Sequence, residues 1–138
     1  MSAARTLVAG RAEGAPIQLG EALSFWGGFD SAGGRIIDRF HPQHGESLSG
    51  RILFVERGRG SSSGASVLAE ALRLGTAPTG ICLLHDDAII ATGALVAAML
   101  YQIACPVVVL DTRERWEELA ARPHVVIEAT ETGGVRFL

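Results

Sequence analysis

The sequence predicts a layered α/β fold with a β-rich N-terminal part, and two observations support this class. From residue 51 onward, short apolar runs alternate with longer segments of helical spacing, the β-α-β-α-β order of a sheet covered by helices. Before residue 51, short apolar runs are separated by glycine-rich turns, as in strands joined by loops. The chain has 138 residues, which suits one domain, so we expect a single domain over 1–138.

The first third of the chain is expected to hold three short strands. Apolar runs predict strands at 6–9, 15–19 and 35–38. Glu13 and Gly14 lie between the first two runs and are typical of a turn. This part therefore reads as short strands, with few residues available for helices.

The rest of the chain predicts a helix-covered sheet. Near-continuous apolar runs indicate strands that are buried on both faces. Gly75 is suited to end the first helix, because glycine readily adopts the left-handed conformation found at helix C-termini. The predicted strands are 51–55, 80–84, 107–110, 125–128 and 135–137, and the predicted helices are 66–74, 87–101 and 114–121.

The segment 88–110 carries no charged residue and is long enough to cross a membrane as a helix. Pro106 interrupts it, however, and the β-branched valines that follow favour a strand. Asp86 and Asp87 precede it, as acidic residues do at the start of a helix. We therefore expect a buried helix, a break at Cys105-Pro106 and a buried strand, and no membrane span.

Composition narrows the functional classes. The net charge of −3 argues against a nucleic-acid-binding surface, which would need clustered positive charge. Cys82 and Cys105 are too few for a disulfide framework and lack the spacing of a zinc site, so we expect no metal site in this chain. The short stretch between Arg5 and Arg11 does not resemble a secretion signal, so we expect a cytoplasmic protein.

The glycine- and serine-rich loop 58–64 is the strongest candidate site. It joins a predicted buried strand to a predicted helix, which places backbone N–H groups and the positive end of the helix dipole at the loop. Ser61, Ser62 and Ser63 lie at its mouth, and Arg57 and Arg59 add positive charge. Such a loop could bind a carboxylate or phosphate, and its charge would favour a serine alkoxide.

A plainer interpretation of loop 58–64 remains open, because serine commonly caps the start of a helix. The loop lacks the lysine of a nucleotide-binding P-loop and does not follow the G-x-S-x-G pattern of hydrolases. An anion or substrate site and a simple helix cap are therefore both compatible with these residues.

Four polar residues upstream are weaker candidates. His41 and His44 lie in the predicted loop 40–50, and their spacing could hold a metal, but no third ligand is near. We expect His41 and His44 to be loop residues, and one of them could contact a substrate. Asp30 and Asp38 flank a turn, which favours turn capping.

Four motifs in the same order resemble the small subunit of the aconitase X family, over about the first 110 residues. The match continues through 74–78. The motifs are LSFWGGFD at 23–30, GRIID at 34–38, the pairs His41-Pro42 and His44-Gly45, and GRGSSSG at 58–64.

This resemblance implies an aconitase-like swivelling β/β/α domain. It implies a large-subunit partner that carries an iron–sulfur cluster or iron, together with most of the substrate site. It also implies that Ser61, directly after the Gly-x-Gly of the loop, is the catalytic base. Arg59, Gly60, Ser62 and Ser63 would bind the substrate or stabilise its anion.

The chain departs from the family just before the loop, where Glu56 and Arg57 replace a more usual Pro-Ser pair. This difference affects the charge expected around the loop. It does not affect the assignment of Ser61 as the base. We expect the side chains of Trp26 and Phe29 to pack within the domain and not to bind a ligand. Both are also candidates for a partly apolar surface that faces the partner.

The function implied by the resemblance is dehydration of a hydroxy acid by a hydro-lyase that is active only with its large subunit. We expect cis-3-hydroxy-L-proline, converted to pyrroline-2-carboxylate, because the Ala/Arg-rich composition without Lys is typical of bacteria. The alternative is mevalonate 5-phosphate, whose phosphate would favour more basic residues than Arg57 and Arg59. A non-enzymatic regulatory module that binds an anion is the alternative of another class.

Overall fold

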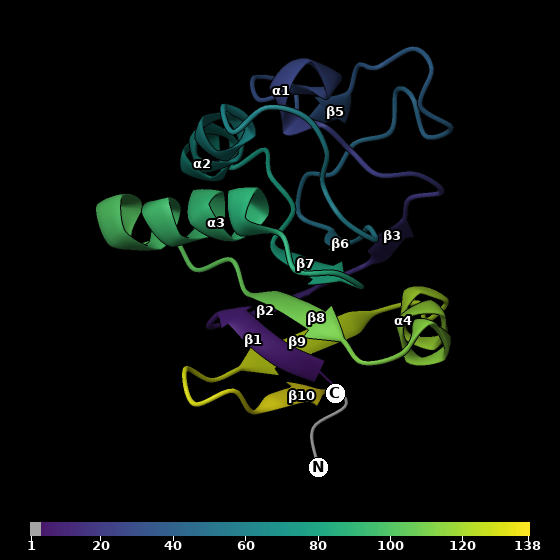
Figure 1. Cartoon of the computed structure of the whole chain (residues 1–138), viewed down its shortest axis with the longest axis vertical. Coiled ribbons are helices and arrows are strands. Elements are labelled where there is room, and N and C mark those ends of the chain that lie inside the picture. Colours follow the sequence, from purple (N-terminus) through teal and green to yellow (C-terminus); the bar gives the residue numbers. More distant parts are fainter. Residues whose placement is uncertain (1–3) are drawn as a thin grey trace.

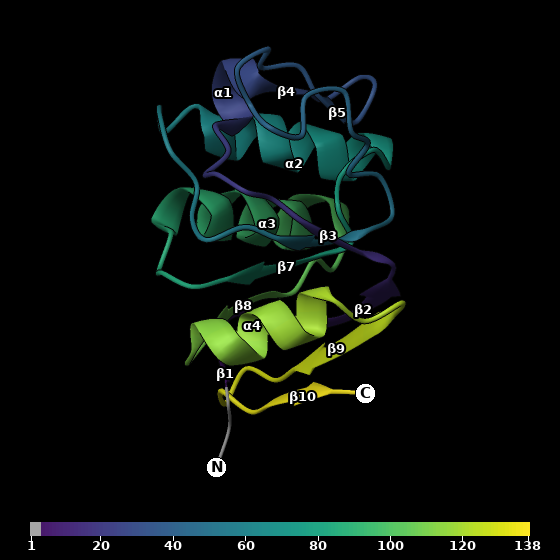
Figure 2. The same ribbon diagram turned by 90° about the vertical axis from the view of Figure 1, so that its right-hand side faces the viewer.

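The structure is a computed structural model that describes residues 4–138, and its layers follow the order β/β/α (Figure 1). Helices α2 (Gly64–Leu74) and α3 (Ala88–Tyr101) cover one face of a five-stranded sheet. A three-stranded sheet covers the other face, and α4 (Arg113–Ala120) lies beside the two sheets (Figure 2). The predicted α/β class and the order of β/β/α layers are confirmed.

The central sheet has the strand order β1-β8-β7-β6-β3. The last four strands of this order are parallel, and β1 is antiparallel to β8. Every residue of β6, β7 and β8 is buried, as their continuous apolar runs predict for strands covered on both faces. The strands are β1 (Ala4–Val8), β3 (Pro16–Gln18), β6 (Ile52–Phe54), β7 (Gly80–Leu83) and β8 (Val107–Leu110).

The second sheet has the order β10-β9-β2, in which β9 (Val125–Ala129) pairs with both neighbours in antiparallel fashion. The hairpin with β10 (Val135–Phe137) agrees with the predicted closing strands. Strand β2 (Gly10–Gly14) was not predicted, and the turn expected at Glu13-Gly14 is wrong. Glycine is needed at position 14 because the backbone of Gly50 lies close to it. A Cβ on Gly14 would be 2.5 Å from the carbonyl oxygen of Gly50.

The helices begin and end close to their predicted positions. Gly75 ends α2 with φ +78°, the left-handed conformation for which glycine is suited. Asp87 caps α3, and Gln102 ends it, so the helix stops before the predicted break at Cys105-Pro106. Within residues 4–138, no helix is both long and apolar enough to span a membrane.

A small substructure covers α2 at the end of the molecule away from the second sheet (Figure 1). It consists of α1 (Phe25–Gly28) and the hairpin of β4 (Phe29–Asp30) and β5 (Arg35–Ile36). The strand predicted at 35–38 is thus shorter than expected, because the chain leaves β5 to form the loop that contains His41 and His44.

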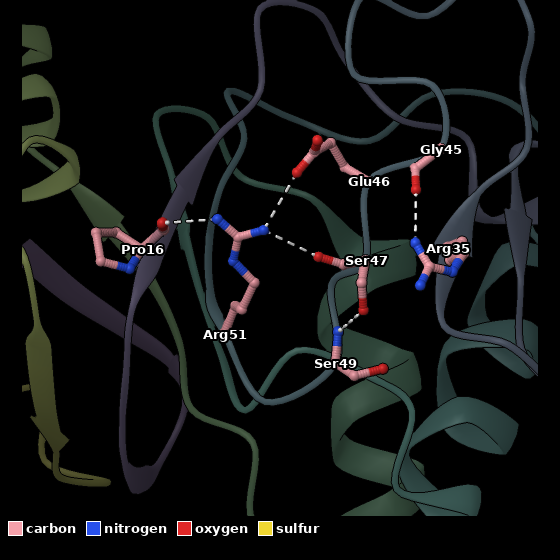
Figure 3. Close-up of polar contacts among 7 residues, drawn as sticks. All are labelled: Pro16, Arg35, Gly45, Glu46, Ser47, Ser49 and Arg51. Carbon is pink, nitrogen blue, oxygen red and sulfur yellow. Dashed lines mark hydrogen bonds and ion pairs between the residues drawn. The ribbon is translucent and has the colours of Figure 1, made fainter.

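Two arginines fasten this loop to the rest of the domain (Figure 3). Arg51 donates to the carbonyl oxygens of Ser47 at 3.2 Å and Pro16 at 3.4 Å, and pairs with the Glu46 carboxylate at 3.4 Å. Arg35 donates to the carbonyl oxygen of Gly45 at 2.9 Å. Arg51 therefore ties the loop to β3 of the central sheet, and Arg35 ties it to the β4–β5 hairpin.

Candidate functional site

Loop 58–64 connects the carboxyl end of β6 to the start of α2, as predicted. Its backbone is held on two sides. The Gly58 N–H donates to Asp87 Oδ2 at 2.8 Å, and the Arg59 N–H donates to the carbonyl oxygen of Leu23 at 3.1 Å. These bonds fix the first half of the loop against the segment before α1 and the start of α3.

Gly60 is the residue at which the loop needs glycine. Its φ is +94°, a conformation that residues with a side chain rarely adopt. A Cβ at this position would also lie 2.6 Å from Ser24 Oγ. The turn that presents the three serines therefore depends on Gly60 for both conformation and space.

The three serines that follow are exposed. Ser63 directly precedes α2 but its side chain makes no capping hydrogen bond. Ser61 makes the serine cap expected for this loop, because its side chain bonds to the backbone two residues on. Its Oγ accepts a hydrogen bond from the Ser63 N–H at 3.1 Å. This bond points a backbone donor at the Ser61 oxygen and favours its deprotonated form.

Three successive backbone N–H groups of the loop remain available. Within residues 4–138, the N–H groups of Gly60, Ser61 and Ser62 make no hydrogen bond. They lie just before the first turn of α2, where the helix dipole is positive. Unpaired donors in this position can bind an anion, whereas the Ser63 N–H is already used by Ser61.

The charges around the loop differ from the sequence expectation. Arg59 does not stand alone, because its Nη2 donates to Asp38 Oδ2 at 3.1 Å. Asp38 Oδ1 also accepts the N–H of Phe40 at 2.9 Å, so the predicted turn capping is confirmed and is joined by an ion pair. Asp30 caps its turn as predicted, through the N–H groups of Ala32 and Gly33.

Glu56, which precedes the loop, is directed toward α4. Its Oε1 accepts from Arg113 Nη2 at 2.7 Å. This hydrogen bond holds the pKa of the Glu56 carboxyl below its ordinary value. The charge of Glu56 is thus paired with α4, and Arg57 beside it is exposed.

A cavity of about 220 Å³ opens beside the loop. Small-molecule sites commonly reach roughly 300 to 1,000 Å³, so this cavity alone is smaller than a typical small-molecule site. Its polar lining comes from Arg59 and Asp87. The lining residues are Leu23, Phe25, Gly58, Arg59, Gly60, Gly64, Asp87, Ile89 and Ile90.

Asp87 is the residue of this site that sequence reasoning missed. The sequence marks it as a helix-start acid, and its Oδ1 does accept the Ile90 N–H at 2.9 Å. Its Oδ2 meanwhile accepts from Gly58, which lies 29 residues away along the chain. One carboxylate therefore joins the start of α3 to loop 58–64, and only the tertiary structure shows the second contact.

The upstream histidines lie outside this site. His41 is 3% exposed, its Nδ1 accepts from the Gln43 N–H at 3.0 Å, and its Nε2 lies 3.3 Å from the Glu21 carbonyl oxygen. His41 is therefore a buried residue of the loop, and His44 is an exposed one. The prediction that both are loop residues is confirmed. Residues 4–138 contain no group of three side chains of His, Cys, Asp or Glu that could hold a metal.

The two aromatic candidates have different environments. Phe29 is 4% exposed and its ring lies 5.3 Å from that of Phe25, so the expectation that it faces a partner is wrong. Trp26 is 58% exposed, so the packing interpretation fails for this residue. The local kink explains the difference: Trp26 and Gly27 leave helical geometry, which turns the indole outward while Phe29 continues into β4.

Both cysteines are buried and unpaired. Burial raises the pKa of the Cys105 thiol to about 12 and that of Cys82 still further. These thiols stay protonated at neutral pH, which makes them poor ligands for a metal.

Comparison with known proteins decides the family. The family described as the Aconitase X swivel domain matches residues 1–136. The chain belongs to this family. The resemblance seen in the sequence motifs is thereby confirmed, and it extends beyond residue 110 into the C-terminal strands.

Two curated relatives carry different names. A cis-3-hydroxy-L-proline dehydratase of Pseudomonas aeruginosa is 47% identical over 119 residues, which are 86% of this chain and 20% of that protein. A phosphomevalonate dehydratase small subunit of Methanothermobacter thermautotrophicus is 35% identical over 133 residues, 96% of each chain. The chain thus spans about a fifth of the first relative and nearly all of the second.

Among solved structures, aconitase X of Thermococcus kodakaraensis in its holo-form has the same fold. The TM-score is 0.76 at 30% sequence identity, over 97% of this chain and 95% of that one. The β/β/α layers described above are therefore those of an aconitase X swivel domain.

Proposed function

We propose that this swivel domain is the small subunit of an aconitase X-type hydro-lyase that dehydrates cis-3-hydroxy-L-proline. The observation that carries the proposal is the 47% identity to a cis-3-hydroxy-L-proline dehydratase over 86% of the chain. A second relative of that name, from Hypocrea jecorina, is 41% identical over 83% of the chain. The Pseudomonas relative exceeds the phosphomevalonate dehydratase small subunits of Methanothermobacter, at 35% identity, and of Methanopyrus kandleri, at 41% identity over 54% of the chain.

Ser61 is the proposed proton acceptor. A serine hydroxyl is a weak base in water, so the site must stabilise its alkoxide. The Ser63 N–H, 3.1 Å from Ser61 Oγ, supports this role, as does the start of α2 directly after the loop. In the proposed reaction, Ser61 removes the proton on the carbon next to the substrate carboxylate.

Arg59 and the unpaired N–H groups of Gly60 and Ser62 are the proposed partners of the substrate carboxylate. Arg59 has five N–H donors, and its ion pair with Asp38 uses one of them. The hydroxyls of Ser62 and Ser63 are exposed at the same mouth and can accept or donate hydrogen bonds. These groups bind the carboxylate and stabilise the charge that develops on it during proton removal.

The large subunit completes the site in this proposal. The cavity beside the loop is small and open, whereas a serine base needs water to be excluded. The backbone of Trp26 lies beside Gly64 of the loop, and Phe40 follows the Asp38 that pairs with Arg59. Trp26 is 58% and Phe40 is 94% exposed, so both offer apolar surface for such a partner. The iron or iron–sulfur cluster implied by the family does not fit the residues described in this chain, so we assign it to the large subunit.

The test is an assay of the purified pair of subunits with cis-3-hydroxy-L-proline and with mevalonate 5-phosphate. We expect turnover of the first and loss of turnover in Ser61→Ala, with the pair still assembled. Ser66→Ala is the control, since this exposed serine lies in the first turn of α2 and outside loop 58–64, and it should leave turnover unchanged. Full turnover in Ser61→Ala would exclude Ser61 as the base.

The same assay separates two other candidate functions. Turnover of mevalonate 5-phosphate alone would favour a phosphomevalonate dehydratase, which the 96% mutual coverage with that small subunit supports. A regulatory module that only binds an anion is supported by the free N–H groups of the loop. It would bind carboxylate or phosphate without turnover of either hydroxy acid.

A further inference from the structure

Asp38 is placed more firmly than the arginine it contacts. Its N–H donates to the Gly28 carbonyl oxygen at 3.4 Å, and its Oδ1 accepts from the Phe40 N–H at 2.9 Å. The side chain is 23% exposed, against 49% for Arg59. The Asp38 carboxylate is therefore held by the backbone of its own turn, with Oδ2 left to meet a donor from elsewhere.

Arg59 reaches that carboxylate across 21 residues of sequence. Its backbone is fixed by the hydrogen bond to Leu23, but the long side chain has many rotamers when nothing restrains it. Within residues 4–138, the guanidinium makes a single hydrogen bond, through Nη2 to Asp38. This contact is what selects one direction for the guanidinium beside the cavity.

We infer that Asp38 is a positioning residue, which orients Arg59 so that its remaining donors meet the substrate carboxylate at loop 58–64. The inference rests on the proposed function. Orientation before binding removes part of the entropic cost of fixing the arginine when substrate arrives. Asp38 acts through Arg59 and does not itself touch the substrate.

One physical effect opposes this role. Asp38 carries a negative charge close to an anion site, so its removal would strengthen binding if repulsion were the main effect. The contact that orients Arg59 is a direct and directional hydrogen bond at 3.1 Å, whereas repulsion between partly exposed charges has no direction and is screened by solvent and salt. We therefore expect orientation to outweigh repulsion, and the two effects change KM in opposite directions.

The first measurement is steady-state kinetics of the two-subunit enzyme with Asp38→Asn. The new amide oxygen can still accept from Phe40, while the charge that attracts Arg59 is lost. We expect KM for the hydroxy acid to rise about tenfold, and kcat to fall as well, because Arg59 also stabilises the charge that develops on the carboxylate. Asp30→Asn is the matched control, since Asp30 also caps a turn but has no hydrogen bond or ion pair with Arg59 within residues 4–138. The KM of this variant should not change.

A double variant tests whether the two residues act together. If Asp38 works through Arg59, adding Asp38→Asn to Arg59→Gln raises KM little beyond the effect of Arg59→Gln alone. An unchanged or lowered KM in Asp38→Asn, or effects of the two substitutions that multiply, would overturn the inference.

A second measurement does not depend on turnover. Nitrogen-15 NMR relaxation of the arginine Nε–H groups in the full chain reports how rigidly each guanidinium is held. We expect the order parameter of Arg59 to fall in Asp38→Asn and to stay unchanged in Asp30→Asn. Equal order in all three proteins would refute the positioning role, even if the proposed substrate proved wrong.

Discussion

At the scale of single residues, Gly60 meets two requirements of the loop, a positive φ and the lack of a side chain next to Ser24. Gly60→Ala should reduce turnover strongly and destabilise the fold by about 1–3 kcal/mol, because φ +94° is strained for alanine and its Cβ would meet Ser24 Oγ. Denaturant unfolding and the dehydration assay measure the two effects.

Gly45→Ala is the matched control for this substitution. Gly45 has φ +87°, but within residues 4–138 nothing other than its chain neighbours lies within 4 Å of an ideal Cβ, and it lies outside loop 58–64. It should show the conformational destabilisation with turnover preserved. Equal turnover in Gly60→Ala and Gly45→Ala would show that the loop tolerates a side chain at position 60.

The ion pair of Glu56 and Arg113 predicts a pH dependence. Arg113 lowers the pKa of folded Glu56 below its ordinary value of 4.5, so the pair stabilises the fold above that pH. The contribution is lost as the pH falls through the lowered pKa. Glu56→Gln should therefore melt at a slightly lower temperature than wild type at pH 7, and the difference should shrink toward pH 3.

Both side chains of this pair are partly exposed, so the expected change in melting temperature is small. Calorimetry at a series of pH values measures it. A difference in melting temperature that stays constant from pH 7 to pH 3 would contradict the assigned cause of the pKa shift.

Burial of Cys105 predicts an unreactive thiol. Its pKa is raised to about 12, so the thiolate that reacts with alkylating agents is scarce at pH 8. Iodoacetamide should leave Cys105 unmodified in the native protein and modify it in denaturant, as mass spectrometry would show. Native labelling at the denatured rate would mean that the site opens readily.

At the scale of elements, the predicted parts are those whose sequence period and burial agree. β6, β7 and β8 are apolar throughout and buried throughout, and α2 has apolar residues at helical spacing. Strand β2 escaped prediction because it has one buried alanine between charged residues and a glycine at each end. Its partner β9 is more than a hundred residues away, and that pairing supplies what the local sequence lacks.

The candidate site divides in the same way. Ser61 and its neighbours could be predicted because a strand, a glycine loop and a helix follow one another directly in the chain. The contacts of Asp38 with Arg59 and of Asp87 with Gly58 could not, since the partners are 21 and 29 residues apart. Local patterns thus predict where the loop lies, while long-range carboxylates decide how it is held.

The contact between α2 and α3 gives a prediction for these elements. A Cβ at Gly93 would lie 2.8 Å from the Ala65 carbonyl oxygen and 3.1 Å from Leu68 Cβ. Gly93→Ala should therefore destabilise the fold by about 1–3 kcal/mol, although alanine favours helix by up to about 1 kcal/mol. Chemical denaturation measures the change in the free energy of unfolding.

Thr92→Ala provides the comparison, because Thr92 is exposed on the same helix. Relief of the β-branched side chain should leave its stability equal to or slightly above wild type. A Gly93→Ala variant as stable as Thr92→Ala would mean that α2 and α3 can move apart to admit the Cβ without loss of stability.

At the scale of the whole molecule, large exposed apolar side chains occur both near loop 58–64 and at the far end of α3. Trp26 and Phe40 belong to the first group, and Met99, which is 71% exposed, belongs to the second. Asp87 and Met99 are separated by most of α3, about 18 Å at 1.5 Å per residue. The two groups therefore offer a partner two distinct places to bind.

The proposed function requires the partner to close over the loop, so the first group should contribute more to assembly. Trp26→Ala and Phe40→Ala should each weaken binding of the large subunit about tenfold or more, since large aromatic side chains often dominate interfaces. Met99→Ala should have little effect, and titration calorimetry of the two subunits measures all three. Weakened binding only in Met99→Ala would place the partner away from Ser61, and the water-excluding role proposed for it would have to be abandoned.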